Sequence, residues 1–135
     1  MELVIDCNIL MSALIALGGK NAKFIFLKDN KLYAPEFLNE EIAKQNEEIK
    51  RKSKLSLENF ELALMLLFAK LEFIPFEEYC FFLEAAKKIS PDTNDVAYFA
   101  VCLLKKCPLW SNDKLLKSQA DVKVLSTSDI LQLFS

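Results

Sequence analysis

Three aspartates, Asp6, Asp95 and Asp113, stand out by where they fall in the sequence. Asp6 directly follows a short apolar run, and Asp113 lies just beyond the apolar pair Leu109 and Trp110. Asp95 lies near the start of the apolar segment that leads into that pair. Ligands of open parallel α/β sheets bind at the carboxyl ends of the strands. If the two apolar runs are neighbouring strands, the three carboxylates meet at that edge.

Clustered carboxylates indicate a bound cation. Carboxylates within about 5 Å of one another repel, and they protonate or move apart unless a cation neutralises them. Oxygen ligands of this kind suit Mg²⁺ or Mn²⁺. A metal so held can activate water and stabilise the charge on a phosphate under attack, and this chemistry needs no histidine.

Other polar residues could complete such a site. A fourth acid could come from Glu40 or Glu41, and Ser111 could bond Asp113 or a metal-bound water. Asn8 and Asp92 are supporting candidates that are also good helix caps. Each of the three aspartates could itself be only a cap or a favourable charge in a first helical turn. Taken together, their positions favour a metal site over a coincidence of caps.

The composition excludes several kinds of catalysis. The chain has no histidine, which excludes Ser-His-Asp and Cys-His chemistry. Its two glycines are adjacent, at Gly18 and Gly19, so there is no G-x-G-x-x-G fingerprint and no phosphate loop. The cysteines form no C-x-x-C pair, which favours reduced thiols in a cytoplasmic protein over a zinc site; they are Cys7, Cys80, Cys102 and Cys107.

Length and charge set the broad class. We expect a single domain over residues 1–135, with no membrane span and no signal peptide. The net charge of −2 does not favour nucleic-acid binding, which usually requires a basic surface. A local basic cluster over residues 50–54 could contact RNA phosphates, although a charge run at a helix end is more often simply solvated.

Strands and helices alternate along the chain. We expect strands over 3–5, 32–34, 71–76, 108–110 and 122–125. Between and after them we expect helices over 8–17, 21–28, 36–54, 57–70, 77–89, 92–106, 111–119 and 130–134. This alternation predicts a doubly wound parallel α/β sheet with helices on both faces. The apolar run 62–68 could be core or a dimer face.

Four stretches, taken in order, resemble the PIN domain, a metal-dependent ribonuclease fold of the kind found in VapC toxins. They are VIDCNIL with Asp6, LYAPEFLNEEI with Glu41, SPDTNDVAYFAVCL with Asp92 and Asp95, and PLWSNDKLL with Ser111 and Asp113. The resemblance favours Asp95 over Asp92 as the third acid, and the apolar Ile42 that follows favours Glu41 over Glu40 as the second. One departure is Cys7, where the family usually has a small hydroxyl residue or alanine.

The resemblance carries specific expectations. It implies a three-layer α/β/α fold with sheet order 3-2-1-4-5 and catalytic acids Asp6, Glu41, Asp95 and Asp113 around Mg²⁺ or Mn²⁺. It further implies endonucleolytic cleavage of RNA and, for a toxin-type member, a small antitoxin partner, while the homodimer is an expectation from the apolar run 62–68. The alternative is a non-catalytic PIN-like module that binds RNA or a protein. A haloacid-dehalogenase-type phosphatase is a weaker idea, because Asn8 stands where that motif needs a second aspartate.

Overall fold

A five-stranded, all-parallel sheet forms the centre of the protein. The computed structural model describes residues 1–133, so Phe134 at the end of the expected last helix lies outside the described residues. The strand order is β3-β2-β1-β4-β5, which confirms the predicted topology. The strands are β1 (Glu2–Ile5), β2 (Lys31–Pro35), β3 (Leu71–Ile74), β4 (Leu109–Trp110) and β5 (Val124–Leu125).

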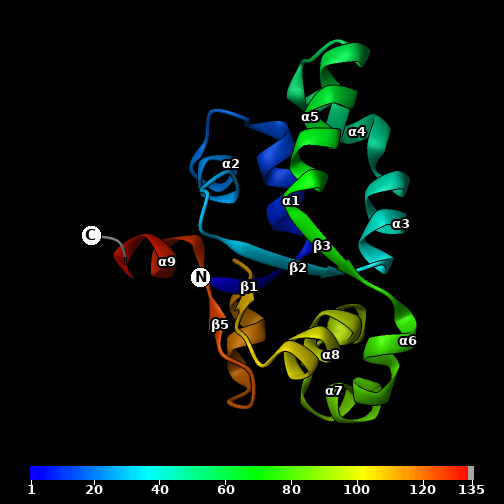
Figure 1. Cartoon of the computed structure of the whole chain (residues 1–135), viewed down its shortest axis with the longest axis vertical. Coiled ribbons are helices and arrows are strands. Elements are labelled where there is room, and N and C mark those ends of the chain that lie inside the picture. Colours follow the sequence, from blue (N-terminus) through cyan, green and yellow to red (C-terminus); the bar gives the residue numbers. More distant parts are fainter. Residues whose placement is uncertain (134–135) are drawn as a thin grey trace.

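Helices cover both faces of the sheet, as Figure 1 shows. One face carries α1 (Cys7–Ile15), α2 (Lys20–Ile25), α3 (Phe37–Lys44), α4 (Asn46–Ser53) and α5 (Leu57–Ala69). The other carries α6 (Phe76–Tyr79), α7 (Leu83–Ile89) and α8 (Val96–Lys105), while α9 (Thr127–Leu133) follows β5. The predicted three-layer α/β/α architecture is therefore confirmed. Strand order reverses between β1 and β4, and the edge of the sheet at that reversal is where such folds bind ligands.

Several predicted helices differ from the observed ones. The segment 36–54 is interrupted at Gln45, and this division leaves Ile42 and Ile49 both buried against the core. The segment 77–89 consists of α6, a 3₁₀ turn η1 (Cys80–Phe82) and α7. The predicted helix over 111–119 is only a 3₁₀ helix, η3 (Lys114–Ser118).

The predicted start of helix 92–106 was wrong. Helix α8 begins at Val96, after a 3₁₀ turn, η2 (Thr93–Asp95). The Asp92 carboxylate accepts a hydrogen bond from the Asn94 backbone N–H (2.9 Å) and so caps this turn rather than the α-helix. A Ser-Pro-Asp sequence can begin either kind of turn, and here the 3₁₀ turn places Asp95 at the cap position of α8.

The core confirms the apolar pattern. Trp110 and Phe99 are fully buried, as expected, and the Phe24 ring meets Trp110 edge-on at 5.1 Å between centroids. Helix α5 lies partly in the core, because Leu67 is fully buried, whereas Leu66 is 51% exposed; the dimer face stays a prediction. All four cysteine thiols are free. Within residues 1–133, no helix combines the length and apolar character that a membrane crossing requires.

Candidate metal site

The pairing of β1 with β4 brings Asp6 beside Ser111. Ile5 is in register with Trp110, so the next residue of each strand lies at the carboxyl edge of the sheet. There the Asp6 backbone N–H donates to the Trp110 carbonyl (3.3 Å), and Ser111 is 1% exposed. The Asp6 carboxylate, 4% exposed, accepts from the Ile9 N–H (2.9 Å) and is the N-cap of α1. The cap interpretation of Asp6 is thus correct.

A polar cavity of about 190 Å³ opens above Asp6. It gathers the four acids predicted for the site, together with the supporting residues Asn8 and Asp92. Its full lining is Asp6, Cys7, Asn8, Met11, Glu41, Gln45, Asp92, Asn94, Asp95, Tyr98 and Asp113. The structure therefore brings together carboxylates from four separate segments of the chain.

The loop after β4 places the last acid. The buried Ser111 hydroxyl accepts from the Asp113 backbone N–H (3.1 Å), and Ser111 also hydrogen-bonds Asp6. The Asp113 carboxylate caps η3 by accepting from the Leu115 N–H (3.0 Å). Ser111 thus lies beneath the cavity and connects two of the acids, in keeping with its predicted supporting role.

Glu41, rather than Glu40, points into the cavity. Its carboxylate accepts a hydrogen bond from the hydroxyl of Tyr98, which is 1% exposed, whereas Glu40 lies exposed on the outer side of α3. Burial and the bond to Glu41 raise the pKa of Tyr98, which keeps its hydroxyl protonated as a donor. Tyr98 was not predicted as a site residue, although its position three residues after Asp95 puts both on one helix face.

Two of the acids hold their protons unusually tightly. Burial raises the pKa of Asp6 to about 6, and the charges of Asp113 and Glu41 add to the rise, while the bonds from Ser111 and Ile9 oppose it. Burial likewise raises the pKa of Asp95 to about 6, with further contributions led by Asp6. Burial is the main cause of both shifts, and the smaller contributions from neighbouring carboxylates indicate that these groups lie close enough to interact.

The donor set fits a hard divalent cation. Carboxylate and amide oxygens predominate around the cavity, and its negative charges need a positive counterpart. Among residues 1–133, however, no three Cys, Asp or Glu side chains already stand at metal-ligand spacing. Two of the acids are fixed by local bonds, since the Asp6 carboxylate accepts from the Ile9 N–H and the Asp113 carboxylate from the Leu115 N–H.

The predicted basic cluster lies elsewhere, on α4. Arg51 and Lys52 both approach Glu48 on their own helix, at 3.8 and 3.2 Å, and all three side chains are exposed. This arrangement matches the solvated-face interpretation of residues 50–54. The sequence did not predict three further residues that line the cavity: Met11, Gln45 and Asn94. Nothing in their local pattern distinguishes them from ordinary helix or turn residues.

Comparisons with known proteins support the fold. A search of curated proteins found no match to this sequence. The structure resembles a chain of VapBC2 from Rickettsia felis, solved bound to a DNA fragment from its promoter, with a TM-score of 0.73 and 16% sequence identity. The match covers 93% of this chain and 98% of the other. A scan against protein families matches residues 4–134 to the PIN domain. The chain therefore belongs to the PIN domain family.

Proposed function

We propose that this protein is a Mg²⁺- or Mn²⁺-dependent endoribonuclease. The observation that carries the proposal is the cavity at the β1–β4 edge, where Asp6, Glu41, Asp95 and Asp113 converge from separate segments. Membership of the PIN domain family supports the same chemistry. The four free thiols fit a reducing, cytoplasmic location.

The position of each residue around the cavity suggests its role in the proposed reaction. Asp6, Asp95 and Asp113 would hold the cation, with Glu41 bound directly or through water. A divalent ion there would supply an activated water and neutralise charge on the phosphate under attack. Ser111 orients Asp6 from below, and Tyr98 fixes Glu41 from the side. These bonds hold the carboxylates in place before substrate arrives, which lowers the reorganisation that binding requires.

Neighbouring glutamates provide a matched test of the site. We expect Glu41→Gln to lower Mn²⁺-dependent RNA cleavage by about 10- to 100-fold, the usual range for loss of a metal-site group. Glu40→Gln removes the same charge from the exposed side of α3 and should leave the rate within about twofold of wild type. Cleavage of a labelled RNA, with Mn²⁺ or with EDTA, gives both rates.

Equal losses in the two variants would contradict the assignment of Glu41. The non-catalytic alternative makes a different forecast: the wild-type protein would neither bind Mn²⁺ in a calorimetric titration nor cleave RNA. Binding of Mn²⁺ that is weakened by Glu41→Gln and not by Glu40→Gln would instead support the nuclease.

An exposed apolar surface provides a place for an inhibitory partner. We call it the α5 surface; it surrounds a cavity of about 300 Å³ lined by Leu17, Phe26, Leu55, Asn59, Leu62, Ala63 and Leu66. Leu62 and Leu66 are 54% and 51% exposed. Grouped apolar side chains of this kind mark protein-binding sites, and grooves between helices commonly accept an amphipathic helix. The occupant we propose is a helix of a small antitoxin, in line with the fold match to a VapBC2 chain.

Charge placed on the α5 surface should separate inhibition from catalysis. We expect Leu62→Glu with Leu66→Glu to weaken binding of the protein encoded by the adjacent reading frame at least about tenfold, because a carboxylate would be buried unpaired. RNA cleavage should be unchanged. Leu57→Glu, on the same helix and also exposed but outside the cavity lining, is the control. If the double variant only turns a dimer into a monomer in light scattering, the occupant is a second copy and the antitoxin assignment is wrong.

A further inference from the structure

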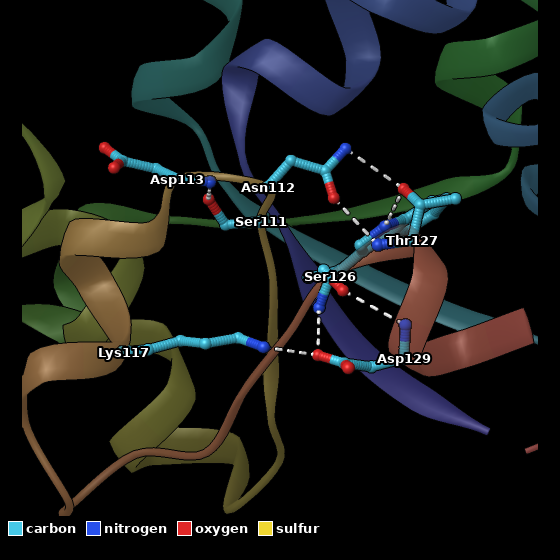
Figure 2. A network of polar contacts seen from close by, with 8 residues as sticks. Ser111, Asn112, Asp113, Lys117, Ser126, Thr127 and Asp129 are labelled. Carbon is cyan, nitrogen blue, oxygen red and sulfur yellow. Dashed lines mark hydrogen bonds and ion pairs between the residues drawn. The ribbon is translucent and has the colours of Figure 1, made fainter. Parts of the chain in front are cut away.

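A polar network on the outer side of the loop after β4 centres on one hydroxyl, that of Thr127 in α9 (Figure 2). Its Oγ1 accepts from Trp110 Nε1 (3.1 Å) and from Asn112 Nδ2 (3.2 Å), and it donates to Asn21 Oδ1 (2.7 Å). A threonine hydroxyl has one donor and two acceptor sites, so this one is saturated. A residue near the end of the described chain therefore contacts β4, the β4 loop and α2 at once.

Asn112 is held from both ends of its amide. In addition to the bond from its Nδ2, its Oδ1 accepts from the Thr127 backbone N–H (2.8 Å). Asn112 is exposed and lies between Ser111, whose backbone is bonded to the Leu125 carbonyl (3.0 Å), and Asp113. Packing does not restrain an exposed loop residue, so the paired bonds to Thr127 fix this part of the chain. Figure 2 shows the Asp113 carboxylate pointing away from the network, on the far side of the loop.

The same network extends to the segment that carries Asp6. Asn21 receives the Thr127 hydroxyl at Oδ1 and donates from Nδ2 to Ser12 Oγ (3.0 Å) in α1. Helix α1 has Asp6 as its N-cap. Thr127 therefore links the two segments that present Asp6 and Asp113 to the cavity, and it does so from outside the cavity.

We infer that Thr127 is a positioning residue for the metal site: through Asn112 and Asn21 it fixes the spacing between the segments that carry Asp113 and Asp6. The inference rests on the proposed function, since it concerns how that site is held. Thr127 itself does not line the carboxylate cavity, so it would act on the site through Asn112 and Asn21.

The test compares three variants of the full chain. Thr127→Val keeps the shape and the backbone N–H but removes the hydroxyl, whereas Thr127→Ser retains it. Lys117→Met is the control, because it breaks the nearby ion pair with Asp129 (2.5 Å) and leaves Asn112 untouched. Two measurements follow: amide hydrogen exchange over residues 111–115, and the Mn²⁺ dissociation constant by calorimetry.

We expect Thr127→Val to speed exchange over residues 111–115 and to weaken Mn²⁺ binding about tenfold, in the range seen when groups that orient metal ligands are removed. Thr127→Ser should restore both values to within about twofold of wild type, and Lys117→Met should leave Mn²⁺ affinity unchanged. Wild-type Mn²⁺ affinity in Thr127→Val would overturn the inference while leaving the proposed function intact. A wild-type protein that binds no Mn²⁺ overturns the proposed function, and the positioning role with it.

Discussion

Asp6→Asn should reduce Mn²⁺-dependent RNA cleavage about 1,000-fold, which corresponds to about 4 kcal/mol of transition-state stabilisation. Asp6 lies at the centre of the carboxylate cavity and is its most buried acid. An amide in its place keeps an oxygen for the Ile9 N–H but removes the charge that would hold the cation. Asparagine caps helices about as well as aspartate, so α1 should form normally.

The stability of the same variant makes the result interpretable. Because burial disfavours the Asp6 charge, Asp6→Asn should leave the free energy of unfolding at pH 7 unchanged or slightly raised. Asp6→Ala, in contrast, also removes the cap and should cost about 1 kcal/mol. Denaturant unfolding alongside RNA cleavage distinguishes the two effects. Asp121→Asn, at an exposed aspartate outside the site, controls for net charge. Cleavage by Asp6→Asn at the wild-type rate would remove Asp6 from the site.

A divalent cation should stabilise the protein strongly, and more at pH 7 than at pH 5. At a Mn²⁺ concentration of 100 times the dissociation constant, the gain is about 2.7 kcal/mol, or roughly 10 °C in Tm for a chain of this size. Protons compete with the cation for Asp6 and Asp95, whose pKa values lie at about 6. At pH 5 both are mainly protonated, so binding must displace protons and the stabilisation shrinks.

Without the cation, the dependence of stability on pH has the opposite sign: the free energy of unfolding falls as pH rises. Both acids bind protons more tightly in the folded chain than at their ordinary pKa of 3.8. Their contribution to the free energy of unfolding is therefore largest below about pH 4 and is lost as pH rises through about 6. For the buried Asp6 alone the change is on the order of 3 kcal/mol. Thermal unfolding in EDTA and in Mn²⁺, from pH 4.5 to 7.5, gives both curves. Parallel curves would show that the cation binds elsewhere.

The positions of the strand ends and of the polar residues that follow them could be predicted from the sequence, because each depends on local pattern. An apolar run that ends in Asp6, and another that ends before Ser111, define strand ends whatever lies between them. The ordered PIN-like stretches supplied the pairing of β1 with β4, which local pattern alone leaves open.

Contacts between distant helices were not predictable in the same way. The bond from Tyr98 to Glu41 joins residues 57 positions apart, and that from Thr127 to Asn21 spans 106. Each depends on how whole helices pack. The local sequence around a tyrosine or threonine does not show which distant residue its hydroxyl will contact. The 3₁₀ turn at Thr93–Asp95 was not predicted either, because a Ser-Pro-Asp sequence can begin either kind of turn.

The pairing of β1 with β4 also governs when activity can arise during synthesis. Asp6 leaves the ribosome about a hundred residues before Asp113, an interval of about 5–20 s at ordinary rates of elongation. Until β4 and the loop after it have emerged, β1 lacks β4 as its second neighbour and Asp6 lacks the Ser111 hydroxyl. The proposed metal site therefore cannot be complete until nearly the whole domain has been made.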